Sequence, residues 1–394
     1  MKVTALFNGT YPNGGPMAKR LHLYCKGLNE LGHTTEIIIP HETVNPRKQQ
    51  ALSYSVQGSY DGVNYRYLSP SLVRSTNFFK RRFSDLKGNI KSLWYLFWTA
   101  KPDIILLIDI RNYLAVLVLF LNFFFRLKVV YELNEHPLIF KSKYGVLFDR
   151  IFVYPFLDGF IVISKPLQVL LSKINRNRAK IILLPIIVED KVSELKKNSL
   201  ADLKTPYILH SGGLIDSKDG IIGMLEAFLM VLERNIELNF FLTGSPDKLL
   251  INRLNEVFKE NLEALSKVKF LGYLQEDLLK VYQANSTLFI INKPNNLQNN
   301  YCFPTKLGEY LSFSKPLIIT NVGEVCNYFT DGYNAYVVEP DRPEQIADKI
   351  VHIINSPSLS NQVGLQAKKL ISSSFDYRLQ ANNLEAFLLE LIVK

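Results

Sequence analysis

The segment from Phe303 to Thr320 contains a lysine and a glutamate at a spacing that could bind a nucleotide. It begins FPTKLGEYL and closes with KPLIIT. A loop that leads into a helix start presents backbone N–H groups to phosphate, and Lys306 adds a positive charge there. One helical turn further on, Glu309 could accept hydrogen bonds from two adjacent ribose hydroxyls. The alternative for Glu309 is an ordinary glutamate on the exposed side of a helix.

Two glycine-rich loops have the composition of phosphate-binding turns. The first is Asn13-Gly14-Gly15-Pro16, soon after an apolar run, and the second is SGGLIDSKDG at residues 211–220. Glycine lets the backbone approach a phosphate closely, and the helix that follows each loop offers its positive end. In the second loop, the Lys218 ammonium could stabilise negative charge on a diphosphate. The alternatives are a simple left-handed turn and a lysine at an ordinary helix start.

A third group of polar residues follows the short apolar run at 129–131. The chain continues there with Glu132, Glu135 and His136. Ligands of parallel sheets gather at the carboxyl ends of the strands, so these three side chains are candidates for contact with a reacting group. Each of them is equally explained as a loop residue or a helix cap, and the sequence does not choose among them.

The elements that must position these residues alternate between strand and helix. Strand-like runs occur at 3–7, 35–39, 104–108, 129–131 and 160–163. After a polar stretch at 189–206 they resume, at 207–210, 238–243, 269–271, 288–291, 317–320 and 335–338. Helical spacing separates them and also marks residues 375–393. Such alternation predicts parallel sheets, and 394 residues suit two domains better than one.

Together with DGYNAYVVEP at residues 331–340, these patterns resemble the retaining glycosyltransferases of family 4. That resemblance implies an α/β protein of the GT-B fold, with two Rossmann-like domains whose parallel sheets face each other across a cleft. Residues 1–190 would form the acceptor domain and residues 205–372 the domain that binds the donor nucleotide. Residues 373–394 would form a helix that crosses back to the N-terminal domain.

The resemblance also assigns roles to the candidate residues. The donor would be bound by Gly14, Gly15, Gly213, Lys218, Phe303, Pro304, Thr305, Lys306 and Glu309. Glu132, Glu135 and His136 would lie near the transferred sugar. Many relatives have an arginine where this chain has Gly213 to Ile215, and a first glutamate where this chain has Tyr301.

The implied activity is a hexosyltransferase reaction. A sugar would pass from a UDP- or GDP-linked donor to a hydroxyl of a glycan or polyprenyl-linked acceptor, in surface polysaccharide biosynthesis. No metal and no other cofactor is expected, because loop amides and lysine take the role of a divalent cation. Two alternatives stay open. One is a sugar-nucleotide 2-epimerase of the same fold, and the other is a non-catalytic homologue that binds a partner.

The net charge of +10 suits an anionic partner. Nucleic acid is disfavoured, because no zinc-finger, RRM or basic-zipper pattern is present. Basic and aromatic residues are interleaved between residues 74 and 98. The basic ones are Arg74, Lys80, Arg81, Arg82, Lys87 and Lys91, and the aromatic ones are Phe78, Phe79, Phe83, Trp94, Tyr95, Phe97 and Trp98. This pattern fits a segment lying on anionic lipid, from which salt would release it, and fits equally a solvated helix whose aromatic face packs on its own core.

The apolar run at Tyr113–Phe125 is shorter than the roughly 20 residues of a membrane span. We therefore predict a buried helix of an α/β domain.

The N-terminal run reads as a strand rather than a signal peptide. Cys25, Cys302 and Cys326 show neither metal nor disulfide spacing, which favours a reducing compartment. A cytoplasmic protein, peripheral on the inner face of the cell membrane, is the expected location.

Overall fold

The computed structural model describes residues 1–46, 55–175, 179–191, 205–259 and 261–393. The chain forms two compact units. Unit 1 comprises Met1–Ile187 and Tyr377–Lys394, and unit 2 comprises Val188–Asp376. The sequence predicts the linker between the two main domains in the polar stretch at 189–206, and residues 192–204 of it lie outside the described residues.

Unit 1 is built on an eight-stranded sheet within the described part of the chain. In spatial order its strands are β3 Gln57–Tyr60, β4 Val63–Tyr67, β2 Thr34–Ile39, β1 Lys2–Phe7, β5 Ile104–Ile108, β6 Lys128–Leu133, β7 Gly159–Val162 and β8 Lys180–Leu183. Neighbouring strands are parallel except β3 and β4, which pair antiparallel. The sequence did not predict this hairpin, because its edge strand β3 is exposed along its whole length and lacks an apolar pattern.

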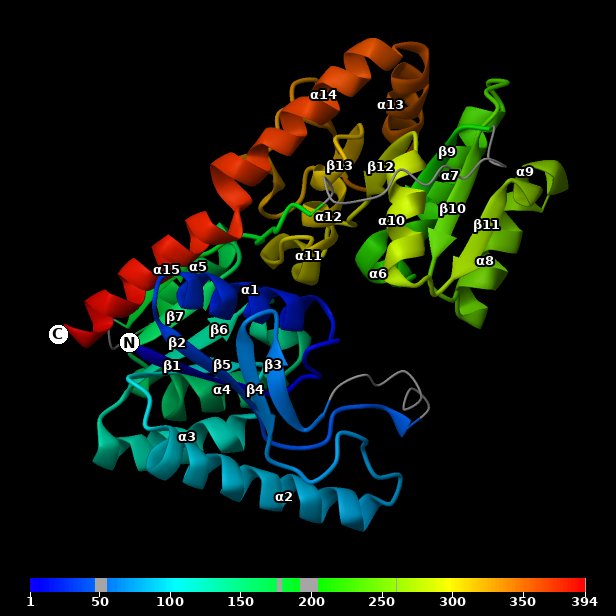
Figure 1. The fold of residues 1–394 in the computed structure, drawn as a ribbon. Coiled ribbons are helices and arrows are strands. Elements are labelled where there is room, and N and C mark those ends of the chain that lie inside the picture. The colour runs from blue at the N-terminus through cyan, green and yellow to red at the C-terminus, as the bar shows by residue number, and fades with distance from the viewer. Residues whose placement is uncertain (47–54, 176–178, 192–204, 260, 394) are drawn as a thin grey trace. The chain divides into compact units, whose positions relative to one another are not determined.

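Helices cover both faces of this sheet. They are α1 Pro16–Glu30, α2 Phe78–Trp94, α3 Asn112–Phe125, α4 Lys143–Phe152, α5 Lys165–Ile174 and α15 Tyr377–Ile392. Figure 1 shows α1 and α15 on one side of the sheet and α2, α3 and α4 on the other. Connections between parallel strands are almost always right-handed. The order in which strands are added along the sheet therefore reverses when the connecting helices change from one face of the sheet to the other.

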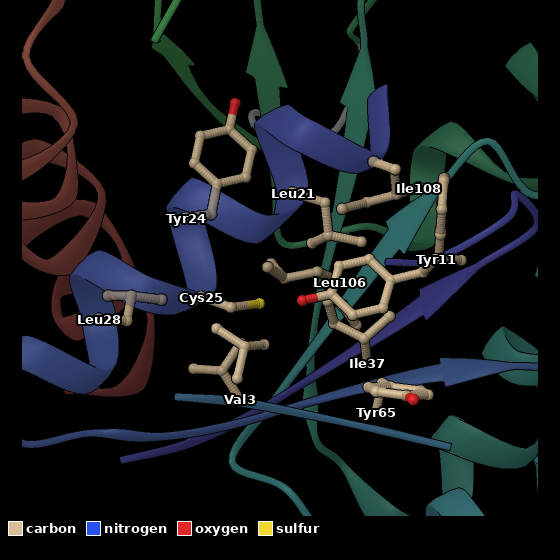
Figure 2. Close-up of a cluster of buried hydrophobic side chains, with 14 of the residues drawn as sticks. Val3, Tyr11, Leu21, Tyr24, Cys25, Leu28, Ile37, Tyr65, Leu106 and Ile108 are labelled. Atoms are coloured by element: carbon tan, nitrogen blue, oxygen red, sulfur yellow. The ribbon is translucent and has the colours of Figure 1, made fainter. Parts of the chain in front are cut away.

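The main core of unit 1 lies under α1. Figure 2 shows Leu21, Cys25 and Leu28 of this helix facing strand residues that include Val3 and Leu106. These side chains are buried, and the α1 residues recur at the spacing of one helical face. Removing apolar side chains from water is the main favourable contribution to this packing. Residues of α15 join the same cluster, so the C-terminal helix is part of the unit 1 core.

The prediction that residues 113–125 form a helix is confirmed, but the prediction that this helix is buried is wrong. Leu114, Ala115, Val118 and Leu119 of α3 are buried, but the opposite side of the helix is exposed. An apolar run of this length cannot distinguish a helix that is covered on all sides from one that is covered on one side. Within the ranges that the structure describes, no helix has both the length and the apolar character required to cross a bilayer.

Unit 2 is built on a second, entirely parallel sheet, in agreement with the predicted alternation. In spatial order its strands are β11 Val268–Gly272, β10 Asn239–Thr243, β9 Tyr207–His210, β12 Leu288–Ile291, β13 Leu317–Thr320 and β14 Tyr336–Val338. Its helices are α6 Asp216–Asp219, α7 Ile221–Leu232, α8 Lys248–Phe258, α9 Leu262–Ser266, α10 Glu276–Asn285, α11 Leu297–Tyr301, α12 Lys306–Ser312, α13 Pro343–Asn355 and α14 Pro357–Leu370. The central strands are apolar and buried on both sides, as parallel strands are in α/β proteins.

A glycine sets the distance between α1 and α15. A Cβ on Gly27 would lie 2.4 Å from the Cβ of Ala381, far inside van der Waals contact. We expect Gly27→Ala to lower the free energy of unfolding by about 1–3 kcal/mol, because the two helices must separate. Gly145→Ala in α4 is the matched control, since its new Cβ meets nothing closer than 3.4 Å. Denaturant unfolding of both variants measures the difference.

A second substitution tests the contact itself. Gly27→Ala combined with Ala381→Gly should recover much of the lost stability, although glycine in a helix costs about 1 kcal/mol on its own. Strictly additive losses in the double variant would mean that residues 27 and 381 do not touch.

Candidate anion-binding site

Charged side chains gather at the carboxyl edge of the unit 2 sheet. His210 is the last residue of β9, and Lys293 follows two residues after β12. Asp219 ends the short helix α6, and Lys306 is the first residue of α12. The carboxyl edge of a parallel sheet is where ligands bind in α/β folds. Lys306 is one of the predicted donor-site residues; Lys293, Asp219 and His210 are not among them.

One carboxylate oxygen organises the cluster. Oδ1 of Asp219 accepts hydrogen bonds from Nζ of Lys293 at 2.7 Å and from Nζ of Lys306 at 3.2 Å. Nζ of Lys293 also donates to the backbone carbonyl of Lys218 at 3.1 Å. The structure therefore links two lysine side chains and the backbone of the predicted Lys218 loop through a single aspartate.

The cluster carries an excess of positive charge. Lys218, Lys293 and Lys306 contribute three positive charges, and Asp219 contributes one negative charge. Burial alone raises the pKa of Asp219, but the two ammonium groups outweigh that effect and hold the pKa below its ordinary value. Burial lowers the pKa of Lys306; Asp219 opposes the shift, while the nearby Lys293 and Lys218 add to it. A sheet edge with surplus ammonium charge is suited to bind an anion.

His210 contributes a neutral ring. Burial and the neighbouring Lys306 lower its pKa to about 3, so the imidazole is uncharged at neutral pH. Its Nε2 lies 3.3 Å from Nζ of Lys306. Because an ammonium can only donate, Nε2 accepts this hydrogen bond and the ring proton is on Nδ1. The ring thus fixes the direction of Lys306 without adding a charge.

Backbone glycine makes room for Lys306. Gly212 has a φ of +137°, a value that favours glycine, and a Cβ there would lie 2.8 Å from Nζ of Lys306. The N–H of Gly212 donates to the hydroxyl of Thr243 at 2.9 Å, which holds the loop in place. The neighbouring Gly213, a predicted donor-site residue, is exposed and has open space where a Cβ would be.

The start of α12 is anchored by aromatic packing. Phe303 is buried and stacks on Tyr328, with ring centroids 5.4 Å apart. Tyr310 is buried beside Phe289, with centroids 4.1 Å apart, and its hydroxyl accepts the backbone N–H of Ser211 at 2.8 Å. This hydrogen bond ties α12 to the 211–220 loop, so the two predicted donor segments are positioned as one structure.

The other predicted residues of this segment differ in exposure. Pro304 is buried, whereas Thr305 precedes α12 as its N-cap and is exposed. Glu309 lies one turn into α12 with its side chain exposed. A buried anchor followed by exposed polar groups is the arrangement expected where a loop faces a ligand.

An arginine from another element lies beside the Lys218 loop, although residues 211–220 themselves contain no arginine. Nη1 of Arg253, from α8, lies 2.6 Å from Oδ2 of Asp216. Asp216 also accepts the backbone N–H of Ile222 at 2.8 Å. Sequence reading could not find Arg253, because its distance along the chain from the loop hides their proximity.

In unit 1, the first glycine loop is sterically constrained at one position. A Cβ on Gly14 would lie 2.0 Å from the carbonyl oxygen of Thr10 and 2.6 Å from the Cβ of Ala18. Gly15 is exposed, is the N-cap of α1 and has no atom near the position of a Cβ. Pro16 then occupies the first helical position, where its missing N–H costs nothing.

Glu132 is engaged in a buried ion pair. Its Oε1 accepts from Nε of Arg20 at 2.7 Å and from the Tyr24 hydroxyl at 2.9 Å. Arg20, itself buried, donates to the carbonyl of Leu184 at 2.6 Å and also to that of Pro185. Glu132 therefore joins β6 to α1, and Arg20 extends the connection to the chain beyond β8. This is a structural role.

Glu135 and His136 lie in the loop after β6, both partly exposed. His136 is the N-cap of a short 3₁₀ turn, and its Nδ1 accepts the backbone N–H of Leu138 at 3.2 Å. Burial lowers the pKa of His136. With Nδ1 as an acceptor, the neutral ring carries its proton on Nε2 and can donate from there.

Comparison with known proteins finds similarity to glycosyltransferases. Residues 191–370 match the family model described as Glycosyl transferases group 1. An uncharacterized glycosyltransferase of Methanocaldococcus jannaschii is 26% identical over 212 residues, which is 54% of each chain. The match thus spans about half the length of that relative.

Similar solved structures cover almost the whole chain. A glycosyltransferase from Rickettsia africae has 17% identity, covers 99% of this chain and 98% of its own, and gives a TM-score of 0.72. Anabaena HepE in complex with UDP and glucose has 16% identity, 99% and 100% coverage, and a TM-score of 0.71. Sucrose-phosphate synthase from Thermosynechococcus elongatus has 13% identity, full coverage of both chains and a TM-score of 0.70. At these identities the likeness defines the fold: the chain has the GT-B fold, and its residues 191–370 match a glycosyltransferase family.

Proposed function

We propose that this protein is a retaining glycosyltransferase of family 4 that uses a nucleotide-diphosphate sugar. The observation that carries the proposal is the Lys218–Asp219–Lys293–Lys306 cluster at the carboxyl edge of the unit 2 sheet. Its net positive charge, partial burial and glycine-containing backbone suit the diphosphate of a UDP- or GDP-linked donor. The Anabaena relative, whose structure contains UDP and glucose, supports a sugar nucleotide as the substrate.

The cluster would act on the leaving group. As the bond between the sugar and the diphosphate breaks, negative charge grows on the outer phosphate. Ammonium groups and backbone N–H groups that are already in place stabilise that charge without reorganising. Lys306, Lys293 and Lys218 would thereby supply what a divalent cation supplies in other transferases. In the retaining mechanism, an oxygen of the departing phosphate takes the proton of the acceptor hydroxyl on the same face of the sugar.

Unit 1 would supply the acceptor side. His136 is neutral and can donate from Nε2, and Glu135 lies in the same loop, so both are suited to hydrogen-bond sugar hydroxyls. The acceptor would be a hydroxyl of a glycan or polyprenyl-linked saccharide in surface polysaccharide biosynthesis. The protein would then work at the cytoplasmic face of the cell membrane, a location that the basic and aromatic segment at residues 74–98 supports.

Nucleotide binding tests this function directly. UDP or GDP at about 100 times its dissociation constant should stabilise the protein by roughly 2.7 kcal/mol. A thermal-shift series with nucleoside diphosphates measures this effect, and the matching nucleosides are the control. No stabilisation by any nucleoside diphosphate would contradict the assignment. Donor consumption that requires an acceptor would then distinguish transfer from epimerisation.

Lys306→Ala should lower the transfer rate by at least about a hundredfold, as removal of a transition-state donor does. The fold should survive, because Asp219 keeps its hydrogen bond to Lys293. Lys248→Ala, an exposed lysine of the same unit, is the control. Rates are measured on protein whose unfolding midpoint has been checked.

Glu309→Ala should also reduce activity strongly, because the ribose hydroxyls would lose the carboxylate that accepts their hydrogen bonds. Glu309 is exposed, so the free energy of unfolding should change by less than about 0.5 kcal/mol. Glu256→Ala, an exposed glutamate on α8, should leave activity intact. Full activity of purified Glu309→Ala protein would remove Glu309 from the site.

Lys218→Ala should weaken binding of a nucleoside diphosphate more than binding of the corresponding monophosphate. The reason is that its loop is expected to face the outer phosphate. Calorimetric dissociation constants for the two ligands, with Lys248→Ala as the matched control, measure the difference. Equal losses for both ligands would place Lys218 elsewhere.

A further inference from the structure

Helix α2 is packed with its polar side inward. Its buried residues are Asp85, Gly88, Asn89 and Ser92. Besides Phe78, its exposed apolar residues recur every three or four positions, and they are Phe79, Phe83, Leu86, Ile90 and Trp94. This spacing places them on one stripe of the helix. A helix on the surface of a soluble domain normally turns such a stripe toward the core.

Helix α4 repeats this inversion, whereas α3 is apolar on its buried side as well as on its exposed side. No charged residue occurs within α3, and its exposed stripe consists of Tyr113, Leu117, Phe120 and Phe124. Asp149 is the buried residue of α4. The exposed apolar residues of α4 are Tyr144, Leu147, Phe148, Ile151 and Phe152.

The three helices lie on the same side of the unit 1 sheet (Figure 1), so their stripes belong to one surface. Helices α2 and α3 are in contact. The Trp98 ring, just beyond α2, lies 5.1 Å from that of Phe125, and the Asn89 amide donates to the Tyr113 hydroxyl at 3.2 Å. Exposure is extreme for apolar side chains: 80% for Phe79, 79% for Phe123 and 84% for Tyr144. We call the exposed apolar residues of α2, α3 and α4, together with Trp98, the apolar face. Apolar exposure on this scale marks an interaction surface.

The charges around the apolar face are positive. In and next to the three helices, the exposed basic residues are Lys80, Arg82, Lys87, Lys91, Arg126, Lys143 and Arg150. The acidic residues of these helices, all of which the structure describes, are Asp85 and Asp149. Both are buried, and they pair with Arg111 at 3.3 Å and with Lys141. An anionic lipid surface complements this pattern, whereas a second copy of the same face would bring like charges together.

We propose that α2, α3 and α4 form a monotopic membrane-binding surface that inserts into the headgroup region of an anionic bilayer. The helices would lie in the plane of the membrane, with aromatic side chains among the upper acyl chains and the basic residues among the headgroups. This inference deepens the membrane location proposed above and rests on it for its biological use. The apolar face belongs to unit 1 and the lysine cluster to unit 2, so nucleotide binding and lipid binding can fail independently.

Apolar insertion differs from electrostatic attraction in its response to salt. At about 1 M ionic strength the Debye length is about 3 Å, and attraction between exposed charges is largely screened. Salt hardly weakens the burial of aromatic side chains in lipid. We therefore expect salt to reduce the affinity for vesicles but not to release the protein fully.

Intrinsic fluorescence reports on this surface without any label. The chain has two tryptophans, Trp94 and Trp98, and both are exposed on the apolar face with their rings stacked 4.9 Å apart. Vesicles of equal parts phosphatidylglycerol and phosphatidylcholine should shift the emission to the blue, and lipids brominated near the headgroup should quench it. Unshifted emission at saturating vesicle concentration would overturn the proposal.

Paired variants identify the residues. Phe123→Ser with Phe124→Ser should lower the vesicle partition coefficient by at least about tenfold. Leu249→Ser with Leu262→Ser, equally exposed residues of unit 2, should leave it unchanged. Both double variants should retain the UDP- or GDP-induced thermal shift. Equal partitioning of the two double variants would overturn the assignment to the apolar face. So would a wild type that ignores vesicles and instead forms a dimer that Phe123→Ser with Phe124→Ser abolishes.

Discussion

The Asp219 carboxylate is the constraint on which the unit 2 site depends. Two ammonium groups, on Lys293 and Lys306, share its Oδ1. Without it, both lysines would be partly buried and unpaired, which is strongly unfavourable. The single negative charge of Asp219 offsets part of the positive charge of the lysines, which lets the loops fold. The positive charge that remains can attract an anion. The uncharged His210 ring is consistent with this balance, because another positive charge there would have no partner.

Unit 1 uses a buried ion pair for the opposite purpose. Glu132 and Arg20 match each other in charge, the Tyr24 hydroxyl donates to Glu132, and two backbone carbonyls accept from Arg20. The two charges of this pair balance, so little is left to attract a ligand, and the pair fixes α1 against β6. The same residue types therefore serve structure in one unit and ligand attraction in the other, and the difference lies in the balance of charges.

The inverted helix α2 shows how a polar side can pack well. Gly88 lets the helix approach the backbone of Pro40 so closely that a Cβ would lie 2.0 Å from its carbonyl oxygen. Asp85 pairs with Arg111, and the Ser92 hydroxyl donates to the Gly88 carbonyl at 2.8 Å. Small residues and paired polar residues thus occupy the inward-facing positions, where a helix of a soluble protein normally has leucine. The apolar side chains are left outward, where a membrane can cover them.

The alternation of apolar runs and helical spacing was enough to predict two mainly parallel sheets, because strands buried on both sides need continuous apolar sequence. It did not predict the antiparallel hairpin of β3 and β4. Local patterns also placed Lys306 at a helix start and Lys218 in a glycine-rich loop. Tertiary structure alone decided which charges meet: Lys293 and Arg253 lie far along the chain from the residues they contact. It also decided that α3 is half exposed and that Glu132 is buried with Arg20. Periodicity records which residues share a face, but which face meets the core depends on neighbours that the chain brings together only when it folds.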